Sequence, residues 1–231
     1  MKEKIIETRI LQRIVMYTAG LFVLAFGVAV SINSRLGVSP VNSIPYILGR
    51  IFDTAPGIWA TSMFAFFIVL QIIILRKKFR WFDISQIVFS FIFGYFLDLI
   101  LWILGGYQIP TYFGQLAMLI ASIFLIAAGL VLIISAKIVA LPPEALCLTI
   151  AGQIKGAKFH NVKIVVDSIL VLTAVTLSLL FLGGLDGIRE GTVISAVLIG
   201  KVIPLVRKAL SPIIRFVHKE EEAKEEVKAE S

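Results

Sequence analysis

The chain has 231 residues, of which 58% are hydrophobic and 16% are charged, and its formal net charge is +7. An average soluble domain is about 45–50% apolar and about 25% charged, so this composition excludes a soluble globule. The single cysteine excludes a secreted domain held together by disulfides within the chain. The composition therefore predicts an integral membrane protein.

Long runs without charged residues indicate where the chain crosses the bilayer. A transmembrane helix needs about 20 mostly apolar residues, and the Gly- and Pro-containing segment 105–110 divides the longest uncharged run into two. The spans must be helical, because a helix satisfies its own backbone hydrogen bonds inside lipid. We predict six spans, at residues 13–33, 57–75, 84–104, 113–136, 162–182 and 188–206.

The positions of lysine and arginine predict the orientation. With six spans, four basic segments fall on one side of the membrane: residues 2–13, 76–80, 155–163 and 207–215. Lys and Arg are enriched on the cytoplasmic side, so both termini are expected in the cytoplasm. The partners that this charge predicts are the lipid bilayer and, at the cytoplasmic face, anionic lipid; nucleic acid is not expected.

Two parts of the chain share a pattern at a shift of 102 residues. The segments that begin at Ala25 and Ala127 each contain the end of a span, then a cation, then a proline. A second match pairs Ser90-x-x-x-Gly94 with Ala196-x-x-x-Gly200, and small residues so spaced predict close helix contacts in both spans. Chance similarity between apolar segments is the alternative explanation.

Each half would contain three spans, so the second half would enter the membrane from the opposite side, as in many secondary transporters. We therefore predict an all-α polytopic fold with two inverted-topology three-helix repeats, at residues 13–104 and 113–206. A cytoplasmic amphipathic N-terminus (1–12) and a cytoplasmic charged tail (207–231) would flank them.

Residues 36–52 and 138–154 are mostly apolar but too short to cross the membrane and return as helices. Each has a proline where a helix could begin, and Ser39 is a candidate N-cap. We expect short Pro-broken half-helices or re-entrant segments, whose N-termini would present free N–H groups near the bilayer midplane. Helices that lie at the two membrane interfaces are the alternative.

Three motifs resemble the YczE/YyaS/YitT group of bacterial integral membrane proteins, closest to its YczE-like branch. They are L-G-V-S-P-V-N-S-I-P-Y-I-L from Leu36, F-G-Y-F-L-D from Phe93, and G-L-D-G-I-R-E-G-T-V-I-S-A from Gly184. The function of this group is largely uncharacterised, so the resemblance implies a location in the bacterial plasma membrane rather than an activity. It also implies a polar Asn where this chain has Phe64, and an acidic position that Asp167 matches.

Charged side chains inside apolar spans cost about 2.5–3.5 kcal/mol near the bilayer centre and are candidates for function. Each candidate also has a structural alternative: a solvated carboxylate, an ion pair between Asp167 and Lys163, a water-facing cap, or a cation that marks a span end. The candidates for coupling to an ion or proton are Asp98, Glu144 and Asp167, those for binding a substrate are Ser39, Asn42, Ser43 and Glu144, and their charge partners are Arg35, Lys137, Lys163 and Lys201.

No catalytic motif is present, and His160 and His218 lack the spacing of metal ligands. We therefore expect no enzyme activity, metal or cofactor. The leading hypothesis is a secondary transporter or permease for a small polar solute. The alternatives are a non-transporting accessory, assembly or signalling protein, and a substrate-binding subunit of a larger importer. A homo-oligomer is compatible with the sequence.

Overall fold

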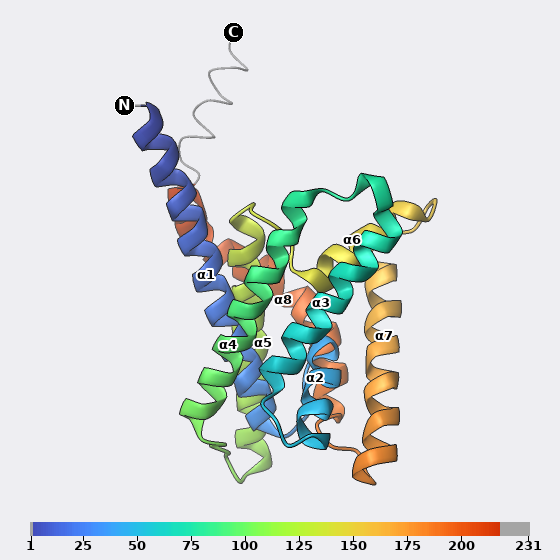
Figure 1. Cartoon of the computed structure of the whole chain (residues 1–231). Coiled ribbons are helices and arrows are strands. Elements are labelled where there is room, and N and C mark those ends of the chain that lie inside the picture. Colours follow the sequence, from blue (N-terminus) through green and yellow to red (C-terminus); the bar gives the residue numbers. More distant parts are fainter. Residues whose placement is uncertain (1, 218–231) are drawn as a thin grey trace.

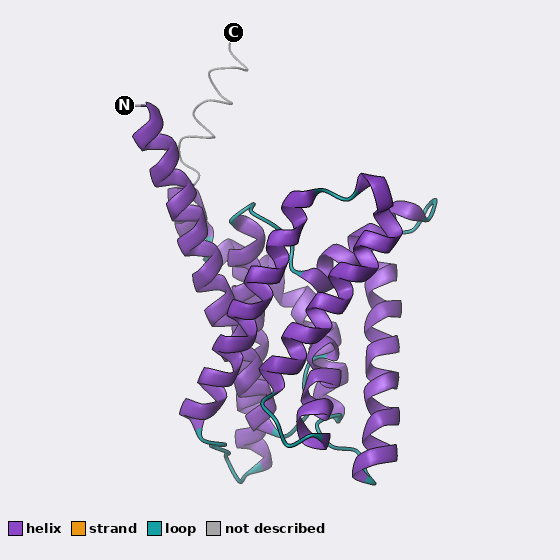
Figure 2. Cartoon of the chain, in the orientation of Figure 1, coloured by secondary structure: helices purple, strands orange, loops and turns teal. Residues whose placement is uncertain are grey.

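The computed structural model describes residues 2–217, with side chains from Ile10 onward, and this part of the chain is helices joined by short loops (Figures 1 and 2). The predicted all-helical class is confirmed for these residues. The long helices are α1 (Lys2–Ser34), α3 (Pro56–Leu75), α4 (Gln86–Leu104), α5 (Tyr112–Ser135), α7 (Phe159–Leu177) and α8 (Glu190–Ala209). The short ones are α2 (Pro40–Ile51), α6 (Pro142–Gln153), the 3-10 turns η1 (Arg76–Lys78) and η2 (Trp81–Ser85), and the π turn η3 (Ser178–Leu182).

Five helical segments in the described part are long and apolar enough to cross a membrane, and they coincide with the first five predicted spans. The helix α8 covers the predicted sixth span but is not among the five; it carries Glu190, Lys201, Arg207 and Lys208. The segment predicted as a separate N-terminus is continuous with α1. Most of the predicted charged tail, residues 218–231 with His218, lies outside the described residues.

The two short helices α2 and α6 begin as the sequence predicts. Each contains 12 residues and has a proline in its first turn, where the missing N–H is not needed. Ser39 occupies the N-cap position of α2, but its hydroxyl makes no capping hydrogen bond. Pro40 and Pro142 are buried, so both N-termini point into the bundle. Figure 1 shows α2 in the lower half of the molecule and α6 in the upper half.

The long helices form one bundle around the short ones. Helix α1 packs along α5, α4 lies beside α1 and α3, and α8 lies beside α5. Helices α2 and α6 each pack against both α3 and α7, so the short helices share the same two long neighbours. The chain enters α1 and leaves α8 on the same side of the bundle (Figure 1).

Glycines allow α1 and α5 to approach closely. A Cβ atom on Gly27 would lie 2.7 Å from the Ile126 nitrogen, and one on Gly129 would lie 2.6 Å from the Leu24 nitrogen. Larger residues would push the two backbones apart. Such small residues are the usual means of packing membrane helices, because lipid provides no hydrophobic drive for helix association.

The predicted helix contacts at the two small-residue pairs hold for α4 and are wrong for α8. A Cβ on Gly94 would overlap the Thr61 hydroxyl oxygen, whereas one on Gly200 would meet nothing within 4 Å. The buried face of α8 contains Thr192, Ser195 and Val206. Gly200 therefore lies on the other face of the helix, which the sequence spacing alone did not determine.

Candidate functional site

A carboxylate–lysine cluster joins the start of α6 to α7. Lys163 Nζ lies 3.1 Å from Asp167 Oδ1, one helical turn away on α7, and 3.8 Å from Glu144 Oε1 in the first turn of α6. All three side chains are mostly buried. The i, i+4 pair was predicted from spacing, and the structure adds Glu144 to it. One cation thus faces two carboxylates, which leaves one negative charge when all three groups are ionised.

The second oxygen of Glu144 makes the cluster a candidate site. Glu144 Oε2 is buried and has no hydrogen-bond partner among the described residues. The Tyr17 hydroxyl on α1 is also buried and has no hydrogen-bond partner in the described part of the chain, and it lies close enough to Glu144 to interact with its charge. Buried polar atoms in proteins are nearly always paired. A proton, a cation or the polar group of a solute would satisfy the free oxygen.

Two buried glutamines, which the sequence reasoning missed, hold the start of α6. Gln71 of α3 and Gln86 of α4 exchange side-chain amide hydrogen bonds of 3.3 and 3.4 Å, and Gln71 Nε2 also donates to the Pro142 carbonyl oxygen at 3.3 Å. Both glutamines are 2% exposed. They fix the backbone two residues before Glu144. The sequence signal that could have found them is one glutamine in each of two mostly apolar spans.

The three polar residues predicted as substrate-binding candidates at α2 are Ser39, Asn42 and Ser43, and local hydrogen bonds satisfy part of their hydrogen-bonding capacity. Asn42 Nδ2 donates to Ser39 Oγ at 2.9 Å, and Ser43 Oγ donates to the Pro40 carbonyl oxygen at 2.6 Å. All three side chains are buried, and Asn42 Oδ1 has no partner among the described residues. Their convergence with Glu144 on one solute stays a prediction.

The loop before α2 is tied to the start of α8. The Gly191 amide donates to the Leu36 carbonyl oxygen at 2.7 Å, and the Val38 amide donates to the Gly187 carbonyl oxygen at 3.0 Å. Buried hydroxyls without a partner among the described residues follow on α8, at Thr192 and Ser195. The motif that begins at Gly184 thus supports the N-terminal end of α2.

Asp98 has a different role from the cluster. Its Oδ1 atom accepts a hydrogen bond of 2.6 Å from the Gly57 amide, and the Ile58 amide donates as well. These are free N–H groups in the first turn of α3, where a carboxylate is favoured by the helix dipole. Asp98 therefore caps α3 from the neighbouring helix α4.

A family model described as a family of unknown function (DUF6198) matches residues 11–208. The chain belongs to this family. A curated relative, the uncharacterized membrane protein YczE of Bacillus subtilis (strain 168), is 28% identical over 190 residues, which cover 81% of each chain. The resemblance to the YczE-like branch is thereby confirmed, and the chain is a membrane protein of a family of unknown function. No solved structure matches it.

In this DUF6198 protein the predicted charge partners separate into different environments. Arg35 and Lys137 follow α1 and α5 with φ of 57° and 53°, so both mark helix ends. Lys201 is exposed on α8, and Lys163 joins the carboxylates of Glu144 and Asp167. Phe64, where the resemblance implied a polar Asn, is buried, and its ring stacks on that of Phe93 with 5.4 Å between the ring centroids.

On the side where α1 ends, a partly exposed group that the sequence reasoning missed links α2 to the loop before α8. Asp186 accepts from Arg50 Nε at 2.8 Å and from the Tyr46 hydroxyl at 3.3 Å. Arg189 pairs with the neighbouring Glu190 at 3.2 Å. Among the described residues, no group of three or more His, Cys, Asp or Glu side chains could hold a metal ion.

Proposed function

We propose that this protein is a secondary transporter or permease that moves a small polar solute across the bacterial plasma membrane. The observation that carries the proposal is the Glu144 carboxylate, which lies at the buried start of a short helix with one oxygen unpaired among the described residues. Ionisable groups at such positions in membrane proteins mark pathways for ions, protons or substrates.

The contact between α1 and α5 supports an inverted repeat. Gly27 faces Ile126, and Gly129 faces Leu24. The 102-residue shift converts each pair into the other, because Gly27 becomes Gly129 and Leu24 becomes Ile126. Reciprocal contacts of this kind are what a two-fold axis between equivalent helices produces.

The short helices and their neighbours support the same symmetry. Helix α6 begins and ends 102 residues after α2. The α2–α7 contact corresponds to the α6–α3 contact, and the α1–α4 contact corresponds to the α5–α8 contact. The symmetry is incomplete, since the extensive α3–α4 contact has no equally extensive counterpart between α7 and α8. In this proposal α8 is the sixth span and both termini are cytoplasmic.

The proposed mechanism uses the two short helices and the cluster. The buried N-terminus of α2 offers backbone N–H groups to an anionic part of the solute, whereas Pro142 and Pro143 leave α6 without its first two N–H groups. Lys163 compensates one of the two carboxylates, so a proton or a cationic group at Glu144 neutralises the remaining charge. A zwitterionic or cationic solute fits this arrangement. Rocking of one repeat against the other would then expose the site to each side in turn.

Binding can be tested with the purified protein and a panel of amino acids, betaines and polyamines. A bound solute stabilises only the folded state, so a hit raises the unfolding temperature. We expect Glu144→Gln to remove this rise. The matched control is Glu190→Gln, which neutralises a carboxylate that is exposed and paired with its neighbour Arg189; it should keep the rise.

Transport itself can be tested in proteoliposomes that contain a pH-sensitive dye. The hit from the panel should drive a proton flux that Glu144→Gln abolishes and Glu190→Gln retains. If no compound stabilises the protein, or if Glu144→Gln responds like the unmodified protein, the transporter proposal fails. The Glu144–Lys163–Asp167 cluster would then be a structural ion network of an accessory protein.

A further inference from the structure

A cavity of about 350 Å³ lies where α3 ends. Its lining differs from the carboxylate cluster, because it contains cations and apolar side chains and no carboxylate. It is lined by Ile72, Arg76, Lys77, Phe79 and Trp81, which come from the last turn of α3, from η1 and the residue that follows it, and from the start of η2. The end of α3 and the turns that follow it lie on the side of the bundle where α1 begins (Figure 1).

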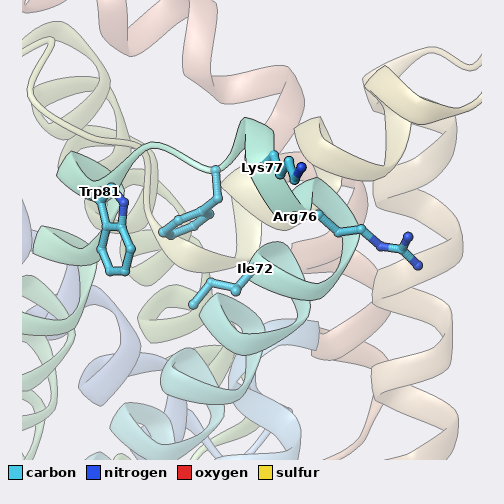
Figure 3. Close-up of a pocket in the computed structure, with 5 residues that line it drawn as sticks. Ile72, Arg76, Lys77 and Trp81 are labelled. Atoms are coloured by element: carbon cyan, nitrogen blue, oxygen red, sulfur yellow. The ribbon is translucent and has the colours of Figure 1, made fainter.

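The lining has a charged part and an apolar part. Figure 3 shows Arg76 and Lys77 on one side and Trp81 on the other, with Ile72 beneath them. Trp81 is 83% exposed and Ile72 is 41% exposed, so the apolar part is open to the surroundings. Amphipathic tryptophan with adjacent cations is typical of the level of lipid headgroups.

The two cations of the cavity are free to bind an anion. Neither Arg76 nor Lys77 has an acidic partner among the described residues, whereas Arg80 nearby is paired with Asp83 at 3.1 Å. The cavity is therefore positively charged, while its apolar side chains would gain little from a free inorganic ion.

The backbone at Arg76 is unusual and directs the chain around the cavity. Arg76 has φ 47° and ψ −116°, while its amide still donates to the Ile72 carbonyl oxygen. Residues other than glycine rarely adopt such a backbone conformation. Residues strained in this way cluster at ligand-binding positions. The turn ends α3 abruptly and leaves Lys77 and Trp81 on opposite sides of the cavity.

We infer that this cavity binds one anionic phospholipid from the leaflet on the side where α1 begins. The phosphate lies between Arg76 and Lys77, and the upper part of an acyl chain lies against Ile72, Phe79 and Trp81. Charge complementarity selects the headgroup, and the apolar lining selects a lipid over a soluble anion. The inference requires only that α3 and α4 cross the membrane, and it is independent of transport.

Tryptophan fluorescence can test this binding in lipid vesicles. The protein has three tryptophans, and in the variant Trp59→Phe/Trp102→Phe only Trp81 remains. Acyl-chain-brominated phosphatidylglycerol should quench Trp81 more than brominated phosphatidylcholine at the same mole fraction. About 1 kcal/mol per cation corresponds to about a fivefold preference in the binding constant for each of the two cations.

The matched variants are Lys77→Gln and Lys78→Gln, which remove the same charge from neighbouring residues. Lys77 lines the cavity and Lys78 does not. We expect Lys77→Gln to reduce the preference for phosphatidylglycerol several-fold and Lys78→Gln to reduce it little. Equal effects of the two variants, or equal quenching by both lipids, would overturn the site in favour of general surface attraction. Displacement of the lipid by millimolar inorganic phosphate would overturn the role of the acyl chain.

Discussion

Asp98 and Glu144 are both carboxylates in apolar surroundings, but their neighbours differ. Asp98 accepts backbone hydrogen bonds at the start of α3. Glu144 contacts Lys163 through one oxygen and has no partner among the described residues for the other. The first carboxylate is explained by the helix that it caps, and the second is left with binding capacity. The free-energy cost of burying a carboxylate does not by itself distinguish the two residues; their hydrogen-bond and ion-pair partners do.

Removal of the Asp98 cap should destabilise the protein. Asp98→Ala leaves the Gly57 and Ile58 amides without their acceptor, and loss of a helix cap typically costs about 0.5–2 kcal/mol. Asp98→Asn keeps an acceptor oxygen and should cost less. The measurement is the unfolding temperature in detergent, which should fall in the order unmodified protein, Asp98→Asn, Asp98→Ala.

The Asp98 variants also separate capping from coupling. In the transport assay, Asp98→Asn should retain solute-driven proton flux, because the oxygen that holds α3 remains. A complete loss of flux in an Asp98→Asn protein of unchanged unfolding temperature would contradict the capping role and move Asp98 into the proton pathway.

At the scale of elements, close packing depends on which face of a helix its glycines occupy. Gly27 and Gly129 lie in the contact between α1 and α5, whereas Gly200 lies on an open face of α8. The backbones of α1 and α5 can approach only because no side chain separates them. This contact brings together the two segments that match at a shift of 102 residues.

Gly27→Ala should weaken the α1–α5 contact. The added methyl group would lie 2.7 Å from the Ile126 nitrogen, and overpacking of this kind typically costs about 1–3 kcal/mol. We expect a clear fall in unfolding temperature, and a similar fall for Gly129→Ala.

Gly200→Ala is the control for the same chemical change in a helix. Its methyl group meets nothing within 4 Å, and alanine is favoured over glycine inside a helix by about 0.5–1 kcal/mol. The unfolding temperature should stay the same or rise. If Gly27→Ala behaves like Gly200→Ala, the α1–α5 packing is looser than the structure has it.

The whole molecule combines five candidate spans with two short helices and α8. The α1 start and the α8 end lie on one side of the bundle, with the basic turn η1 on that side as well (Figure 1). Positive charge on one side predicts that this side is cytoplasmic. The proposed crossing of α8 and the inverted repeat both depend on this arrangement.

Cysteine labelling in intact cells measures the orientation. In a Cys147→Ala background, a membrane-impermeant thiol reagent should react with Tyr107→Cys and not with Lys78→Cys. Both side chains are exposed; Lys78 precedes α4 and Tyr107 follows it, so they lie beyond its opposite ends. Thr111 is a less suitable position for a labelled cysteine, because its hydroxyl oxygen accepts a hydrogen bond from the Gly114 amide and so caps α5. The reverse labelling pattern would overturn both the orientation and the inverted repeat.

The sequence alone determined the class of the protein, the places where its helices lie and the short Pro-started helices. These features depend on composition, on the length of apolar runs and on the backbone limits of proline, all of which act within a few residues along the chain. The i, i+4 pair of Lys163 and Asp167 was predictable for the same reason.

Only the tertiary structure decided which polar groups meet. The Gly57–Asp98 and Gln71–Pro142 hydrogen bonds join residues 41 and 71 positions apart. An almost uniformly apolar helix has no polar face that fixes its rotation against its neighbours, so its sequence does not say where one amide or carboxylate points. Side-chain packing sets that rotation, and it places Glu144 beside Lys163 while it turns Gly200 outward.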